Sequence, residues 1–206
     1  NGLSNGKKII DIRRPYQAEF NRLKKLELPM SFYKKFIKRC KYFGVIPMIT
    51  CFAREDLVKI QELGFKNIKV ASYDCGSFPM IREICKKFKN IFISTGATFD
   101  DEIKKTKLIC QKYKVNPVFL HCVTIYPTFQ KDFNLKRISF LKSLTKNVGY
   151  SDHSPATNNK KNFASMAAIY FGARYIERHI TILEPNMTKD GVVSIKPEDI
   201  KKIKYF

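Results

Sequence analysis

The 206 residues of this chain, 44% of them hydrophobic and 17 of them Phe, can bury a sizeable core, which excludes an intrinsically disordered protein. No stretch approaches the ~18 apolar residues of a membrane-spanning helix, so we expect a cytoplasmic protein without a membrane partner. The formal charge of +21 suits a nucleic-acid binder. However, lysines are spread over every predicted helix and Arg, the better base reader, is sparse. We therefore interpret the charge as solvated helix faces and do not expect a nucleic-acid partner.

In chain order, the first thirty residues offer only one weak strand candidate, KKIIDI at 7–12. Six short runs rich in Ile, Val and Phe follow, and such runs are typical of strands buried on both faces. These runs cover 45–52, 67–74, 91–96, 117–124, 147–152 and 173–180. Helical patterns lie at 31–43, 54–64, 77–89, 99–114, 136–146 and 159–172. A last helix is expected after Lys196, with Pro197 near its first turn.

Six alternations of strand and helix predict a parallel sheet, either open and doubly wound or closed as a (β/α)8 barrel. No G-x-G-x-x-G follows a strand, which weakens a dinucleotide-binding open sheet. Polar residues instead gather at the carboxyl ends of several strands, where barrels build their active sites. We therefore predict an α/β, TIM-type barrel present as about six βα units, although a complete one takes about 250 residues. With no interdomain linker visible, we interpret 1–206 as a single partial barrel domain without a second domain.

Six Cys occur without a C-x-x-C pair, and the chain is too long for a disulfide scaffold. Their neighbours are apolar, so buried and reduced thiols of a cytosolic protein are expected. They are Cys40, Cys51, Cys75, Cys85, Cys110 and Cys122.

Two of the three His follow consecutive predicted strands, namely His153 and His179. Consecutive strands of a barrel are neighbours, so both imidazoles are expected to meet above the rim and to suit Mn²⁺, Zn²⁺, Co²⁺ or Fe²⁺. Asp152 or Glu177 would orient a ring from behind. The alternative is a pair of hydrogen-bonded rim histidines with no metal. His121 lies within a strand and is expected to be a satisfied core histidine.

Small hydroxyl residues also end the strands, and such groups with backbone N–H groups can hold a phosphate. They are Thr50, Ser72, Ser94, Thr95 and Ser151. Lys69 lies in the middle of an apolar run, where a charge is unfavourable unless it meets an anion. The alternative is that Lys69 extends outward between the helices. Alone, Asp190 reads as part of a turn and Tyr126 as part of a loop.

Seven stretches together resemble the sialic acid synthase family, and they keep the family's order. They are RLKKLEL, KVASYD, ISTG, LHCVTIYPT, VGYSDHS, GARYIERHIT and KPED, and they run from about Arg22 to the last predicted helix. The pairing of SDH with ERHIT, behind HCxxxYP, is the most specific part. A different barrel enzyme using phosphoenolpyruvate or pyruvate would share the chemistry but not this pairing.

The resemblance implies a (β/α)8 barrel that condenses phosphoenolpyruvate with an N-acylated mannosamine-type aldose to a nine-carbon 2-keto-3-deoxy acid and phosphate. It implies a divalent metal, Mn²⁺ with Mg²⁺ or Co²⁺ as alternatives, on His153 and His179. It assigns phosphoenolpyruvate to Thr50, Lys69, Ser72, Ser94 and Ser151. It assigns the sugar to Asp74, Tyr126, His179 and Asp190, with His179, Asp74 and Asp190 as catalytic residues. The family's sites also imply a homodimer.

The chain departs from the family pattern in three ways. Nothing matches the Glu, Lys and Gln of the family's first two strands, and the usual C-terminal antifreeze-like domain has no counterpart. Tyr73, Asp74 and Thr124 stand where the family often has Gly, Glu and Asn. The loop that usually reads Gly-Pro-Asp reads Thr188-Lys189-Asp190. The alternative hypothesis is therefore a truncated or degenerate, non-catalytic barrel that acts as a basic binding module.

Overall fold

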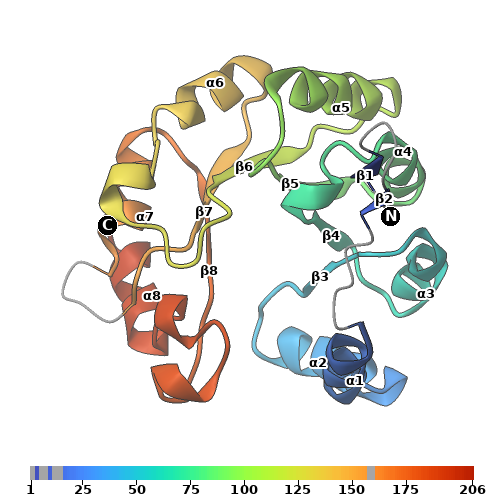
Figure 1. Cartoon of the computed structure of the whole chain (residues 1–206), viewed down its shortest axis with the longest axis horizontal. Helices are drawn as coiled ribbons and strands as arrows, with labels where there is room; N and C mark the ends of the chain where they lie inside the picture. The colour runs from blue at the N-terminus through green and yellow to red at the C-terminus, as the bar shows by residue number, and fades with distance from the viewer. Residues whose placement is uncertain (1–2, 5–8, 11–15, 157–160) are drawn as a thin grey trace.

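The computed structural model describes residues 3–4, 9–10, 16–156 and 161–206, and its centre is one sheet of six parallel strands in chain order. The strands are β3 (Met48–Thr50), β4 (Asn67–Val70), β5 (Asn90–Ser94), β6 (Val118–Cys122), β7 (Val148–Asp152) and β8 (Tyr175–Arg178). All six predicted strands are confirmed, each shorter than the apolar run that predicted it. The sheet curves, and helices cover its outer side as an arc (Figure 1).

The helices are α1 (Tyr16–Leu26), α2 (Met30–Tyr42), α3 (Leu57–Glu62), α4 (Phe78–Lys87), α5 (Asp100–Lys112), α6 (Arg137–Leu144), α7 (Phe163–Tyr170) and α8 (Pro197–Lys204). The sequence pattern missed α1. The apolar residues of α1, Phe20, Leu23 and Leu26, are all exposed. The helix therefore lacks the broad apolar stripe that marks a core-facing helix in a sequence. No helix in the described part of the chain is long and apolar enough to cross a membrane.

The weak strand candidate at 7–12 does not join the parallel sheet. Its described part, β2 (Ile9–Ile10), pairs antiparallel with β1 (Leu3–Ser4) as a separate two-stranded ribbon. Residues 7–8 and 11–12 of the candidate lie outside the described residues. The possible strand is therefore confirmed at Ile9–Ile10, but it adds no strand to the barrel sheet.

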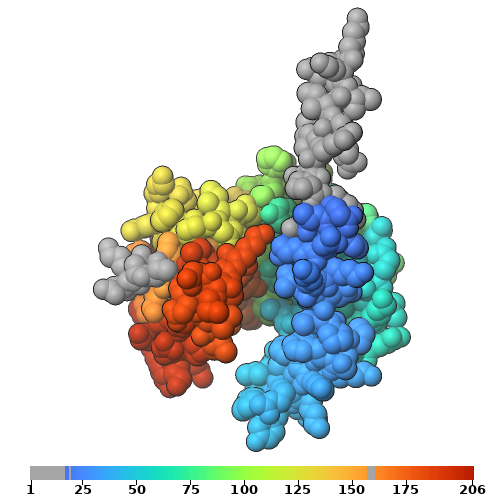
Figure 2. Space-filling model, turned by 60° about the horizontal axis from the view of Figure 1, so that its bottom comes forward, coloured from blue at the N-terminus to red at the C-terminus, as the bar shows by residue number. Residues whose placement is uncertain are grey.

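The parallel sheet is an open arc rather than a closed barrel. In the described ranges, β3 and β8 each pair with one neighbour only, and they do not pair with each other. Figure 2 shows α1 and α2 on one side and the last segments of the chain on the other, separated by a notch in the surface. The prediction of a partial TIM-type barrel of six βα units is confirmed.

The two faces of each strand lie in different surroundings, because successive side chains of a strand point to opposite sides of the sheet. Ile68, Val70 and Ile93 are fully buried in the core cluster beneath the helices. Side chains of the other parity point to the inner side of the arc, where Phe92 and Tyr175 meet edge to face with ring centres 5.6 Å apart. Gly149 lies between them in the sheet, and a Cβ there would come 2.5 Å from Leu120 Cδ2, so only Gly permits this close packing.

The thiol prediction is confirmed for all six Cys, which are free and buried.

Candidate active site

Side chains from five neighbouring strands and their following loops meet in a pocket of about 150 Å³ at the carboxyl end of the sheet. Its lining residues are Lys69, Ala71, Ser72, Tyr73, Ser94, Cys122, Thr124, Tyr126, Ser151, His153, Glu177 and His179. Seven residues predicted for the site are therefore brought together. Three others, Thr50, Asp74 and Asp190, do not line this pocket.

Lys69 is the buried cation of the pocket. It is only 8% exposed, and its Nζ donates a hydrogen bond to Ser94 Oγ at 2.7 Å. The same Nζ lies 3.4 Å from Glu177 Oε1, across the arc from β4 to β8. The alternative that Lys69 extends outward between the helices is wrong, because residue parity on β4 turns it to the inner side. The Lys69 Nζ also lies 3.5 Å from the Val70 carbonyl oxygen, so a hydroxyl, a carbonyl and a partly exposed carboxylate surround it. A lysine charge at the wall of a pocket is suited to binding an anion.

Glu177 joins Lys69 to Ser151. The Ser151 hydroxyl donates a hydrogen bond to Glu177 Oε1 at 2.6 Å, and Ser151 Oγ also lies 3.3 Å from His153 Nε2. The sequence placed Glu177 behind a histidine ring, but the structure shows no hydrogen bond from it to either ring in the described residues. Glu177 instead supplies the negative charge that balances Lys69.

His153 turns its Nε2 toward the pocket, where the Tyr126 hydroxyl is its hydrogen-bond partner, so a metal ion at Nε2 would replace that hydrogen bond. Its Nδ1 lies 2.8 Å from the Val123 carbonyl oxygen, which can only accept, so Nδ1 carries the proton. Burial lowers the pKa of His153, which keeps the ring neutral and leaves a lone pair on Nε2. The Tyr126 ring stacks on His153 with centres 4.0 Å apart, and its Oη lies 2.8 Å from Nε2. Burial raises the pKa of Tyr126 to about 12, so its hydroxyl stays protonated.

His179 completes the aromatic group. Its ring centre lies 5.6 Å from that of His153 and 5.8 Å from that of Tyr126. Asp190 Oδ2 is 3.9 Å from His179 Nδ1, at the edge of ion-pair range. The structure therefore brings the two predicted metal ligands side by side, with Asp190 on the outer flank of His179.

The donor set fits a divalent metal ion. The rings of His153 and His179 are close enough to share one ion, and the Val123 carbonyl fixes the tautomer that a metal-binding imidazole needs. Within the described residues, no group of three or more His, Cys, Asp or Glu is arranged to hold a metal. Two imidazoles would then leave the other coordination positions to oxygen atoms of water or substrate, as Mn²⁺ or Mg²⁺ accept.

Asp152 does not orient either histidine ring, contrary to one of the sequence alternatives. Its carboxylate lies on the helix-facing side of β7, where Oδ1 is 2.7 Å from Arg178 Nη1. Ser165 Oγ on α7 donates a hydrogen bond to Oδ2 at 2.5 Å. The physical reason is parity again: Asp152 lies one residue after Ser151 and one before His153, so it points to the opposite face.

Thr50, Asp74 and Thr95 lie in other surroundings. Thr50 lines a separate pocket of about 290 Å³ together with residues before and within α2 and α3. Asp74 ends a one-turn 3₁₀ helix, Ser72–Asp74, where burial raises the pKa of its carboxyl. Thr95 is buried and donates a hydrogen bond to the Leu120 carbonyl at 3.0 Å.

Cys122 is a pocket residue that the sequence reasoning missed. Its Sγ lies 3.1 Å from Ser72 Oγ, so it contacts a residue predicted to bind phosphoenolpyruvate. The alternation of side chains could have indicated it: Cys122 lies two residues before Thr124, so it is expected to point to the same side as that residue. His121 is buried as expected, but it is only half satisfied: Nε2 lies 2.8 Å from the Phe133 carbonyl, whereas Nδ1 has no partner in the described residues.

Comparison with known proteins gives consistent results. Residues 6–205 match the family model described as NeuB family. The chain is 32% identical over 192 residues, 91% of this chain and 56% of the relative, to N,N'-diacetyllegionaminic acid synthase of Campylobacter jejuni. It is 28% identical over 181 residues, 86% of this chain and 47% of the relative, to N-acetylneuraminate-9-phosphate synthase of Drosophila melanogaster.

Solved structures with the same fold include members of related synthase families. A crystal structure of N-acetylneuraminic acid (sialic acid) synthetase from Leptospira borgpetersenii in complex with citrate superposes with a TM-score of 0.84 at 26% identity, covering 92% of this chain and 65% of that one. A truncated 3-deoxy-D-arabino-heptulosonate 7-phosphate synthase from Thermotoga maritima, 14% identical with a TM-score of 0.68, shares the fold. The chain spans about half the length of the curated relatives it matches.

Proposed function

This chain belongs to the NeuB family, and we propose that the protein condenses phosphoenolpyruvate with an N-acylated mannosamine-type aldose. The products are a nine-carbon 2-keto-3-deoxy acid and phosphate. The observation that carries the proposal is the convergence of Lys69, Ser94 and Ser151 with the paired rings of His153 and His179 in one pocket. An anion-binding cation and a pair of imidazoles are the two elements that this condensation needs.

The phosphoenolpyruvate subsite is built around Lys69. Its ammonium binds an anionic group of the substrate, and the hydroxyls of Ser72, Ser94 and Ser151 supply further hydrogen bonds. Glu177 holds Lys69 and Ser151 before substrate arrives and gives way to the incoming anion. Thr50 lies in a different pocket, so its part in phosphoenolpyruvate binding is supported by the family resemblance alone.

His153 and His179 would hold a divalent metal, which we propose is Mn²⁺, with Mg²⁺ or Co²⁺ as alternatives. When bound, such an ion supplies Lewis-acid polarisation of the open-chain sugar aldehyde. The Val123 carbonyl keeps Nε2 of His153 unprotonated for this purpose. Tyr126 stacks on His153 and covers that side of the pocket, which excludes water from the ring.

The proposed sugar-binding residues are Tyr126 and His179, which line the pocket, and Asp190, which lies outside it beside His179. C3 of phosphoenolpyruvate attacks the aldehyde carbon, water adds at C2, and the tetrahedral intermediate expels phosphate. Asp190, beside His179, is placed to orient the sugar or the attacking water. Asp74 has the same proposed part, which rests on the resemblance because its carboxyl does not line the pocket. We also propose that the protein is a cytoplasmic homodimer.

The test is phosphate release by the complete natural protein from phosphoenolpyruvate in the presence of Mn²⁺ and N-acetylmannosamine or a diacetamido-trideoxyhexose. We expect release only when both substrates are present. Lys69→Met should reduce kcat/KM by about tenfold to a hundredfold, the loss expected for one charge-assisted hydrogen-bonded anion contact. The exposed residue Lys104 supplies the control variant Lys104→Gln, which should retain full activity.

Two results would contradict the proposal. One is the absence of phosphate release across all of these sugars with metal present. The other is phosphate release that is indifferent to His153→Ala. Salt-sensitive binding to polyanions, together with that indifference, would support the alternative of a non-catalytic basic module.

A further inference from the structure

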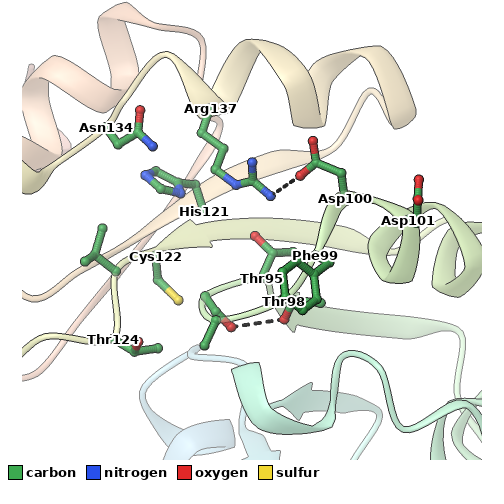
Figure 3. Close-up of a pocket in the computed structure, with 13 residues that line it drawn as sticks. Thr95, Thr98, Phe99, Asp100, Asp101, His121, Cys122, Thr124, Asn134 and Arg137 are labelled. Atoms are coloured by element: carbon green, nitrogen blue, oxygen red, sulfur yellow. Dashed lines mark hydrogen bonds and ion pairs between the residues drawn. The ribbon is translucent and has the colours of Figure 1, made fainter.

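A second and larger cavity lies beside the candidate active site. It has a volume of about 730 Å³ and is formed by the loops that follow β5 and β6 and by the first residues of α5 and α6. This volume is within the range of small-molecule sites, roughly 300–1,000 Å³. Figure 3 shows Asn134, His121 and Arg137 along one side, facing Thr98, Cys122 and Thr124. None of the proposed catalytic residues lines it.

The cavity wall contains a buried acceptor without a donor. His121 is 2% exposed, and its Nε2 must carry the proton because it faces the Phe133 carbonyl at 2.8 Å. Burial lowers the pKa of His121, which keeps the ring neutral and makes Nδ1 an acceptor. Within the described residues, Nδ1 has no hydrogen-bond partner. Leaving a buried acceptor without a hydrogen bond is unfavourable, so a donor from outside the fold is favoured there.

The charges around the cavity are already balanced. Arg137 on α6 pairs with Asp100 on α5, and Lys104 pairs with Asp101 at 3.2 Å. An anion would meet the carboxylates of Asp100 and Asp101, and a cation would meet Arg137. The wall thus favours a neutral molecule that offers hydroxyl groups to Asp100, Asp101 and His121 and accepts a hydrogen bond from Arg137.

An aromatic side chain stands at the rim. Phe99, the residue before α5, lines the cavity and is 80% exposed. An exposed aromatic face beside hydrogen-bonding side chains suits a ligand with an apolar face and a polar edge, as in the ring of a sugar. Cys122 and Thr124 line both this cavity and the candidate active site, so an occupant of one lies against the wall of the other.

We propose that this cavity is a second binding site, for a neutral, hydroxylated small molecule of about monosaccharide size, with His121 Nδ1 as an acceptor and Phe99 as the apolar platform. Nδ1 is covered by neighbouring atoms, so binding includes a small side-chain shift at the cavity wall. The site goes beyond the proposed condensation and does not depend on it.

The experiment follows the imidazole ¹⁵N signals of the complete natural protein during titration with methyl glucoside, N-acetylglucosamine and myo-inositol, without phosphoenolpyruvate. The His121 signal is assigned by comparison with His121→Gln. We expect at least one probe to shift the His121 Nδ1 signal saturably while the His153 and His179 signals stay in place. Inorganic phosphate, as an anionic probe, should not shift it.

Phe99→Ala keeps the proposal testable even if His121→Gln does not fold, because Phe99 is exposed. It should weaken the binding of the responsive probe about fivefold, the loss expected for one aromatic contact. Phe129→Ala, which removes an exposed Phe outside the cavity, is the matched control and should not change the affinity. The proposal is overturned if no neutral probe gives a saturable His121 shift, if the shifts occur only at His153 and His179, or if phosphate alone binds.

Discussion

The ion pairs on the two faces of β7 and β8 differ in how deeply they are buried. Toward the helices, Asp152 and Arg178 form an ion pair at 2.7 Å with side chains 0% and 3% exposed. Toward the inner side of the arc, the neighbouring residue Glu177 is 34% exposed and meets Lys69 at 3.4 Å. Two consecutive residues of β8, Glu177 and Arg178, therefore form ion pairs on opposite faces of the sheet. In the closed pair of Asp152 and Arg178, losing one partner would leave the other charge buried without compensation, whereas the open pair of Lys69 and Glu177 lines the pocket.

The helix-facing pair also shapes the segment that carries His153. Arg178 Nη1 donates to the Asp152 carbonyl at 3.1 Å and to Ser154 Oγ at 3.0 Å. Its Nη2 reaches the Lys161 carbonyl at 3.4 Å. One guanidinium thus fixes the backbone on both sides of His153, because its planar group presents several donors at once. The hydrogen bonds of Arg178 on the helix-facing side thus hold in place the segment that presents His153 to the pocket.

The largest expected effect comes from breaking the closed pair. Arg178→Met leaves the Asp152 carboxylate buried without its counter-charge, so we expect the free energy of unfolding to fall by about 3–5 kcal/mol. Urea denaturation of the complete protein measures this. Lys104→Gln, which breaks the exposed pair with Asp101, should leave the denaturation midpoint unchanged. A loss below about 1 kcal/mol for Arg178→Met would mean that the buried pair is no stronger than an exposed one.

An intermediate effect is expected from the open pair. Glu177→Gln keeps an acceptor for Ser151 but removes the charge that competes for Lys69, so phosphoenolpyruvate should bind about fivefold more tightly, equivalent to one partly exposed ion pair. Calorimetric titration without the sugar measures this. Glu184→Gln is the matched control, since Glu184 pairs with Lys196 away from the pocket. Unchanged or weaker binding by Glu177→Gln would show that Glu177 does not compete with the substrate anion.

The smallest effect concerns His121 and pH. Burial lowers its pKa in the folded state, so the unfolded chain takes up the proton first as the pH falls through about 6.5. The His121 contribution to stability is therefore complete above that pH and decreases below it, by at most about 1.4 kcal/mol per pH unit. Unfolding measured from about pH 8 to pH 5.5 should show a flatter profile for His121→Phe. Identical profiles for the two proteins would contradict this.

Much of the fold could be read from local patterns. Short apolar runs bounded by turn residues predicted six strands, and all six are in the sheet. The strand ends were overextended, as at 45–52, where only Met48–Thr50 is strand, because apolar residues continue into the flanking loops. Helix α1 was missed since its apolar residues are exposed and leave no periodic buried stripe.

The candidate site was read less completely. Strand-end position selected Ser72, Ser94 and Ser151, and the family motifs added Tyr126; all four line the pocket. Strand-end position also selected Thr50 and Asp74, which lie outside the pocket, because the end of a strand does not specify the direction in which the following turn carries its side chains. Cys122 was passed over because an apolar neighbourhood in sequence looks the same for a core thiol and a pocket thiol.

The alternation of strands and helices and the parity of each strand residue follow from local sequence patterns, since both are local properties of the backbone. Parity alone separates Glu177 from Arg178 and Ser151 from Asp152. Which partners meet across the arc depends on the three-dimensional fold: Lys69 meets Glu177, His153 meets His179, and His121 borders a neighbouring cavity. Those distances depend on how far the sheet curves and on how the loops after each strand fold back, and neither property is encoded in any single segment.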